Sequence, residues 1–259
     1  MWRGRVKDSL FGASDPAAVE IINPEGRSPF LLLGDHAGNA IPQRLGDLGV
    51  SAADRLRHIA WDIGVSDLGQ DLARRLDAVF VRQHYSRLVI DCNRDPAEAG
   101  AMAEVSDGVT IPGNLGLTAE QKQARIDAIH QPYQAAIAAE IVRRLSVGLK
   151  TVLVSLHSFT PRMDGFQRPW HAGVLFDGRN DAFAWALLAR LQAEQGLHVG
   201  ENEPYRMNTV DHTVPLHAFA AGLAYAELEI RQDLLADADG VTAWAERLER
   251  CLNAALPSA

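Results

Sequence analysis

The chain has 259 residues, of which 47% are hydrophobic and 22% are charged, a composition typical of a globular protein that can bury a large core. Its formal net charge is −8 and it contains no basic tract, which argues against binding to nucleic acid or to an acidic membrane surface. No apolar run is as long as the roughly 18 residues that a transmembrane helix needs, so we expect no membrane span. The first eight residues are not followed by the apolar segment of a secretory signal, so we expect none. With only two cysteines, Cys92 and Cys251, we expect reduced thiols and a cytoplasmic protein.

The first half of the chain predicts buried strands around one helical region. Residues 30–34 form an apolar run typical of a strand, and residues 51–76 have helical spacing that Gly64 interrupts. Residues 78–81 and 87–92 are expected to form two further strands. Residues 95–116 are rich in Pro, Gly, Ala and Asp and lack periodicity, so we expect a long loop that acts as a lid.

The second half alternates helices and strands. Thr118 and Gln121 have the spacing of a capping box, which predicts the start of a long amphipathic helix. Later strands are expected at 151–156, 173–176 and 223–230, and later helices at 180–194 and 241–252. Unbroken apolar strands alternating with helices predict a single α/β domain over residues 1–259. We expect a three-layer αβα sandwich of the phosphorylase/hydrolase type, with a mainly parallel or mixed central sheet.

Polar residues gather where the predicted strands end. In open α/β sheets, ligands bind beyond the carboxyl ends of the strands, so these side chains should converge. They comprise Asp35, His36, Asn93, Arg94, His157, Ser158, Glu227, Glu229 and Arg231. Two imidazoles and a carboxylate, with water in the fourth position, are the donors of a catalytic zinc site. A further carboxylate can act as general base, and arginines can bind an oxyanion or a substrate carboxylate.

Five segments carry a family resemblance, in the family's order. They are 35–42 (DHAGNAIP), 58–64 (HIAWDIG), 86–94 (SRLVIDCNR), 156–159 (LHSF) and 229–233 (EIRQD). Together they resemble the signatures of the N-formylglutamate amidohydrolases over about residues 30–235. More distantly, the settings of His157, Glu229 and the Asn93–Arg94 pair are similar to those in zinc carboxypeptidases and aspartoacylases.

The resemblance implies a zinc ion held by His36 and His157, but one ligand departs from the distant relatives. Carboxypeptidases and aspartoacylases bind metal through His-x-x-Glu on the first loop, whereas this chain has Asn39 at the glutamate position. Asp62 is our candidate for the missing carboxylate. His58 lies one helical turn earlier and is its rival, better suited to packing or to supporting a ligand.

The resemblance also assigns roles around the metal. Glu229 is the expected general base, with Glu227 as its rival. Arg94 is the expected catalytic arginine, although either Arg94 or Arg87 could stabilise the oxyanion or bind a substrate carboxylate. The expected substrate-binding residues are Arg87, Asn93, Ser158, Tyr205, Arg206 and Arg231.

The implied reaction is hydrolysis of N-formyl-L-glutamate to formate and glutamate, a step of histidine breakdown. The residues themselves support only a small anionic amide, such as another N-acyl amino acid. Two alternatives stay open: a metal exopeptidase or aspartoacylase-like deacylase, and a non-catalytic protein that binds small molecules on the same scaffold.

Overall fold

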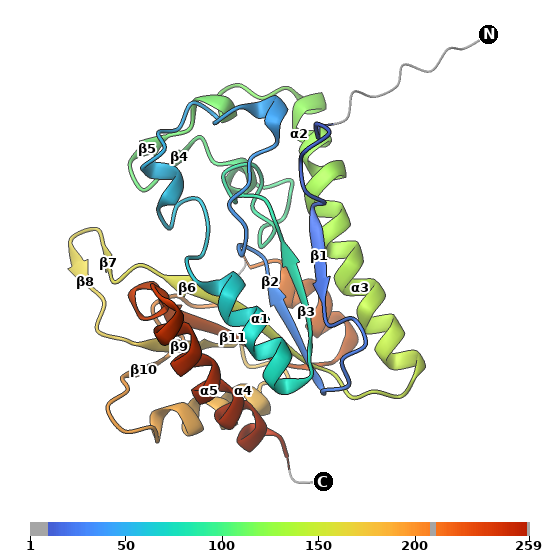
Figure 1. The fold of residues 1–259 in the computed structure, drawn as a ribbon, viewed down its shortest axis with the longest axis vertical. Helices are drawn as coiled ribbons and strands as arrows, with labels where there is room; N and C mark the ends of the chain where they lie inside the picture. The colour runs from blue at the N-terminus through green and yellow to red at the C-terminus, as the bar shows by residue number, and fades with distance from the viewer. Residues whose placement is uncertain (1–9, 208–210, 258–259) are drawn as a thin grey trace.

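A mixed sheet of seven strands forms the centre of the molecule, in the order β1-β3-β2-β6-β11-β9-β10 (Figure 1). The structure is a computed structural model that describes residues 10–207 and 211–257. The N-terminal residues, for which we expect no secretory signal, lie outside the described residues. The sheet strands are β1 (Val19–Ile22), β2 (Phe30–Gly34), β3 (Val79–Gln83), β6 (Val152–Phe159), β9 (Ala172–Leu175), β10 (Val199–Glu201) and β11 (Ala224–Arg231). Strands β4 (Val105–Ser106) with β5 (Val109–Thr110), and β7 (Arg162–Met163) with β8 (Phe166–Gln167), form two separate hairpins.

The four central strands β3, β2, β6 and β11 run parallel to one another. At one edge of the sheet, β1 pairs antiparallel with β3. Toward the other edge, β9 pairs antiparallel with β11, and β10 pairs parallel with β9. Every residue of β2 and β6 is buried, as expected for strands covered on both faces.

Helices flank this sheet. Helices α1 and α5 pack together, α4 packs on β11, β9 and α5, and α3 lies along β1 and β3 across the sheet from α1 (Figure 1). Their bounds are α1 Val65–Leu76, α2 Ala119–Arg125, α3 Gln131–Ser146, α4 Ala182–Gln192 and α5 Ala238–Ala255. The predicted α/β fold with a mainly parallel, mixed sheet is therefore confirmed. Among the described residues, no helix is long and apolar enough to cross a membrane.

Local sequence signals explain where two helices begin. The Thr118 side chain accepts a hydrogen bond from the Gln121 backbone, and the Gln121 side chain accepts one from the Thr118 backbone, so the predicted capping box is confirmed. A π-helical turn, Ile126–His130, joins α2 to α3 in one long run. The predicted helical region 51–76 forms an α-helix only after Gly64. The residues before Gly64 contain a single 3-10 turn, Asp54–Leu56, so the prediction is wrong for 51–63. Gly64 has φ = 82°, and α1 starts directly after it.

The predicted strand at 87–92 is wrong. These residues form a buried turn rather than a strand, although Leu88, Val89 and Ile90 are among the most buried side chains. Side chains take the place of a neighbouring strand. Asn114 donates to Leu88 O (2.9 Å) and Arg125 donates to Val89 O (2.9 Å). The apolar run thus reflects burial alone, which periodicity cannot distinguish from a strand.

The segment 95–116 is more structured than the predicted loop. It contains the β4–β5 hairpin and two 3-10 turns, Ala99–Met102 and Pro112–Asn114. Strands β1 and β10 were not predicted, because each is short and forms an edge of the sheet, where no long apolar run is required.

Candidate metal centre

Three chain segments converge at the carboxyl end of the central strands. His36 follows β2, Asp62 lies in the loop before α1, and His157 belongs to the end of β6. A backbone hydrogen bond from Asp62 N to His36 O, of 2.9 Å, ties the first two segments together. The loop after His36 turns closely because Gly38 has no side chain: a Cβ there would lie 2.0 Å from His84 O.

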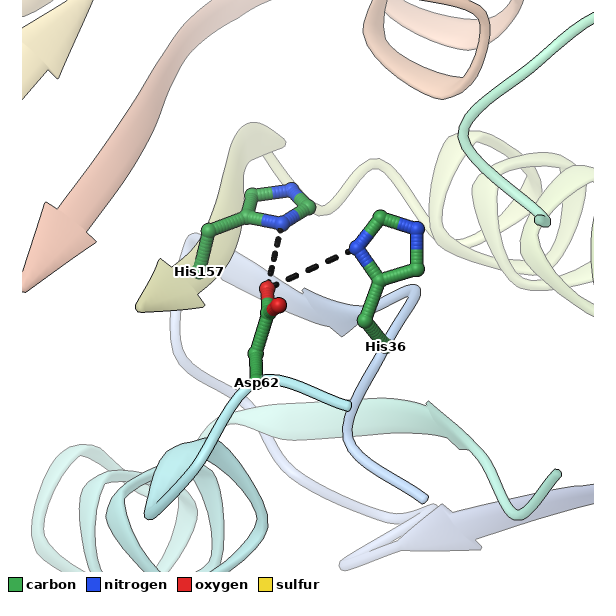
Figure 2. Close-up of side chains that lie close together, drawn as sticks. All are labelled: His36, Asp62 and His157. Atoms are coloured by element: carbon green, nitrogen blue, oxygen red, sulfur yellow. Dashed lines mark hydrogen bonds and ion pairs between the residues drawn. The ribbon is translucent and has the colours of Figure 1, made fainter. Parts of the chain in front are cut away.

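His36, Asp62 and His157 form a buried cluster (Figure 2). Asp62 Oδ2 lies 2.9 Å from Nδ1 of His157 and 3.5 Å from Nδ1 of His36. One ligand atom from each residue lies within 4.8 Å of the other two. Two imidazole nitrogens and a carboxylate oxygen match the donor set of a three-residue zinc site, so these residues fit a divalent cation.

The ring nitrogens that face away from Asp62 have partners of their own. Asp91 Oδ1 lies 2.6 Å from Nε2 of His36, and Ser155 Oγ lies 3.1 Å from Nε2 of His157. Asp35 Oδ2 is also 3.4 Å from Nε2 of His157. Histidine ligands of metals commonly donate their second N–H to such groups, which fixes the tautomer and leaves the other nitrogen for the metal. The contacts therefore favour Nδ1 as the ligating atom of both rings.

Charge pairing dominates the electrostatics of this cluster. Burial opposes ionisation of Asp62 and Asp91, but Arg87 and His36 outweigh it and hold the pKa of both carboxyls far below the usual range. Arg87 lies 3.3 Å from Asp62 Oδ1, and its guanidinium also contacts the His36 ring. Because Asp91 is closer to His36 Nε2 than Arg87 is (2.6 against 3.0 Å), we assign the Nε2 proton to the Asp91 contact.

Glu227 and Glu229 form a second acidic element on β11. Glu229 pairs in register with His157 of the neighbouring strand, and Glu227 lies two residues earlier on the same face. Both side chains are buried, and each has one oxygen without a hydrogen-bond partner among the residues the structure describes. Burial raises the pKa of Glu229 to about 7, against the influence of His157.

A cavity of about 590 Å³ opens over the cluster. It is lined by all the predicted site residues except Arg231: His36, Asp62, Arg87, Asn93, Arg94, His157, Ser158, Tyr205, Arg206 and Glu229. The structure does not bring Arg231 into this cavity. Its guanidinium instead binds Asp233 (2.8 Å) and the Trp170 carbonyl (3.3 Å).

The two rival ligand positions lie outside the cluster. Asn39, which stands where distant relatives have glutamate, donates to Arg55 O at 2.7 Å. His58 lines the cavity, but its nearest ion-pair partner is Asp107 at 3.6 Å.

Sequence reasoning assigned no role to several residues that shape the site. Asp91 belongs to the family-like segment 86–94, so the sequence located it without revealing its contact with His36. Arg168 carried no signal: it is buried, donates to Tyr205 Oη at 3.0 Å, and lies 4.7 Å from the Tyr205 ring centre. It therefore helps to position Tyr205, one of the predicted substrate-binding side chains.

The segment 203–206, which carries Tyr205 and Arg206 and forms one wall of the cavity, packs directly on the sheet. Gly173 of β9 is paired in register with Glu229, and a Cβ at Gly173 would lie 1.7 Å from Glu203 O. The missing side chain therefore lets the segment before Tyr205 lie against the strand beside the general-base candidate.

Fold and cluster together define an α/β protein with a candidate His–Asp–His metal centre at the carboxyl edge of its parallel strands. The sequence model of the N-formylglutamate amidohydrolase family matches residues 28–236, and the chain belongs to this family.

The chain is also similar to individual proteins. The chain is 28% identical over 165 residues to an N-formylglutamate deformylase from Pseudomonas putida, a match that covers 60% of this chain and 57% of that relative's length. A solved structure of a gene product from Agrobacterium tumefaciens is 36% identical, with a TM-score of 0.92 over 95% of this chain and 97% of the other. The structure of an N-formylglutamate amidohydrolase from Ralstonia eutropha JMP134 shares the fold, at 22% identity and a TM-score of 0.66, over 92% of this chain and 96% of that one.

Proposed function

We propose that this protein is a zinc-dependent amidohydrolase that cleaves the amide bond of an N-acyl acidic amino acid such as N-formyl-L-glutamate. One juxtaposition carries the proposal: the buried His36–Asp62–His157 cluster lies beside the Glu229 carboxyl group, in one cavity lined by arginines. Family membership and the curated relative's name supply the amide substrate. The expected setting is the cytoplasm, in histidine breakdown.

The cluster supplies the cation site. His36, Asp62 and His157 would hold the zinc ion, which when bound polarises a carbonyl and lowers the pKa of a water molecule. Asp91 contacts Nε2 of His36, and Asp35 contacts Nε2 of His157. Both rings therefore keep Nδ1 for the metal ion.

Glu229 is the proton carrier of the proposed reaction. It takes a proton from the water that adds to the carbonyl carbon, and it delivers that proton to the nitrogen as the carbon–nitrogen bond breaks. Its Oε2 has no hydrogen-bond partner among the described residues, so no such partner of the protein competes for this atom. Glu227 points to the same face but pairs in register with Ser155, two residues from His157.

Arginines bind the anionic groups. Arg87 lies beside His36 and Asp62, where a guanidinium can donate to the oxygen on which negative charge develops. Arg94 and Arg206 line the same cavity and can hold substrate carboxylates. Asn93 and Ser158 also line it, but both are engaged with the protein: Asn93 accepts from His212 N and Thr213 N, and Ser158 donates to Ile63 O.

Metal content and formate release test the proposal together. Protein purified without chelator should contain close to one zinc ion per chain and release formate from N-formyl-L-glutamate. His36→Ala and Asp62→Ala should lose both properties. His58→Ala is the matched control, because His58 lines the cavity outside the cluster, and it should keep the zinc. Protein that stays metal-free after incubation with zinc would overturn the mechanism.

A further inference from the structure

Several of the residues that line the cavity have no role in the proposed reaction. Beside the charged groups, its lining includes six apolar side chains: Ile59, Leu88, Ala103, Val105, Phe159 and Met163. A formyl group is a single carbon with its oxygen, and glutamate has a charged side chain, so N-formyl-L-glutamate offers these residues little to bury. A volume of about 590 Å³ is instead in the range of pockets that enclose drug-sized ligands.

Two of these apolar residues come from the small hairpins. Val105 belongs to β4 and Met163 to β7, and the two hairpins project on the same side of the molecule in Figure 1. Val105 is 58% exposed even though it lines the cavity. Its apolar surface is therefore available to a bound molecule, and covering such surface is favourable.

The β4–β5 hairpin is fixed at both ends. Asp107, at its tip, forms an ion pair with Arg57, which also binds Asp54 at 2.9 Å. At its base, Ile111 N donates to Glu104 O at 2.8 Å, and the Asn114 side chain donates to Ala103 O at 2.8 Å. Val105 is thus held in place as part of a wall.

The β7–β8 hairpin is anchored by Arg168. The Arg168 backbone donates to Pro161 O at 2.9 Å, and its buried guanidinium donates to Thr160 O at 3.3 Å. Met163 is therefore also positioned before substrate arrives, which lowers the ordering cost of binding.

We propose that the substrate carries, besides its carboxylate, an apolar group of several carbons that lies against Val105 and Met163. This inference rests on the proposed amide hydrolysis, not on the acidic side chain of the amino acid, and it names the substrate class as N-acyl amino acids with an extended apolar group. That apolar group can belong to the acyl side or to the amino-acid side of the amide bond. The two hairpins would bury it in the same way in either case.

Two substrate series distinguish these sources. In the first, glutamate is constant and the acyl group grows from formyl to butyryl, hexanoyl and benzoyl. In the second, formyl is constant and the amino acid changes from glutamate to norvaline, methionine and phenylalanine. In one series we expect kcat/KM to exceed that of N-formyl-L-glutamate and to rise by about fourfold per buried methylene. The series that rises identifies the side that carries the apolar group.

Substitutions then test the two residues. Val105→Ser and Met163→Ser should flatten the rise in that series. Phe166→Ser is the matched control, since Phe166 pairs with Met163 in the hairpin and is 59% exposed but does not line the cavity; it should leave the rise intact. Thermal unfolding verifies that each variant is folded.

The negative outcomes are distinct. If N-formyl-L-glutamate has the highest kcat/KM and each added carbon lowers it, this inference is wrong and the proposed function stands. A rise that survives both serine variants removes Val105 and Met163 from the explanation and overturns the inference as well. If no amide of either series is hydrolysed by zinc-loaded protein, the proposed function itself fails.

Discussion

Asp91 Oδ1 lies 2.6 Å from Nε2 of His36. Nε2 is the ring nitrogen that faces away from Asp62, whereas Nδ1 faces Asp62 (Figure 2). A carboxylate in this position orients the ring and increases the basicity of the nitrogen left for a metal. The pair thus connects the buried turn at 87–92, which contains Asp91, to the metal centre.

Asp91→Asn should weaken zinc binding by roughly 10- to 100-fold, because the amide is a poorer acceptor for the His36 N–H. Competition with a chromophoric chelator measures the dissociation constant directly, without reference to turnover. Asp54→Asn, which alters a carboxylate outside the cavity, serves as the control. An unchanged zinc dissociation constant in Asp91→Asn would show that the contact does not tune the ligand.

Glu229→Gln should lower kcat for amide hydrolysis by roughly 10²- to 10⁴-fold while zinc content stays normal, since the amide cannot carry the proton. Single-turnover formate release and elemental analysis of the same sample measure both quantities. Glu227→Gln removes a carboxyl group from the same face of β11 and should cost much less. The reverse order of effects would assign the general base to Glu227.

Arg206→Ala should lower kcat/KM by roughly 10- to 100-fold, mainly through KM, because a charged hydrogen bond to a substrate carboxylate is lost. Arg231→Ala is a matched control, since Arg231 binds Asp233 and Trp170 outside the cavity. Steady-state kinetics on N-formyl-L-glutamate and N-formyl-L-glutamine completes the test. If Arg206 binds the side-chain carboxylate, its removal should affect the glutamine derivative far less. Equal KM values for wild type and Arg206→Ala on both substrates would exclude this contact.

His217 should make the fold sensitive to acid. Burial lowers the pKa of His217 from 6.5 to about 4, and its Nε2 is 2.7 Å from the Gln134 side-chain oxygen. As pH falls below 6.5 the unfolded chain takes up a proton that the folded chain binds only near pH 4, so stability decreases across this window. The shift corresponds to a loss of about 3 kcal/mol once pH is below both values.

Urea unfolding of wild type and His217→Gln, compared between about pH 7 and about pH 4.5, measures this contribution. The variant should lose less stability on acidification, because glutamine can still donate to Gln134 and does not titrate. His198→Gln, which replaces an exposed histidine, should follow the wild type. Parallel pH profiles for wild type and His217→Gln would contradict the assignment.

The sequence predicted the fold class because the central strands are continuous apolar runs and the helices begin at local signals such as Thr118 and Gly64. It also located most of the cavity lining, because side chains that follow parallel strands gather at one edge of the sheet. The same rule placed Asn93 and Arg94 at that edge for a wrong reason, since the run before them is a buried turn.

Other features depend on contacts between distant residues. The turn at 87–92 exists because Asn114 and Arg125 satisfy its carbonyls, and no pattern within those residues reveals those partners. Arg231 lies two residues after Glu229, so the strand pattern places both on the same face. Arg231 is the last residue of the strand, however, and its side chain binds Asp233 instead of entering the cavity. Period two determines the face of a strand but not the direction that a long side chain takes beyond its end.

Gly173 has a consequence for how this scaffold can change. A methyl group there would collide with Glu203 O, so any larger residue would displace the wall that carries Tyr205 and Arg206 and disturb the strand paired with Glu229. Substrate preference and catalytic geometry are thus linked at one backbone position. New specificities can be introduced at low structural cost by exchanging side chains on the wall and the hairpins, whereas moving the wall itself would alter the chemistry as well.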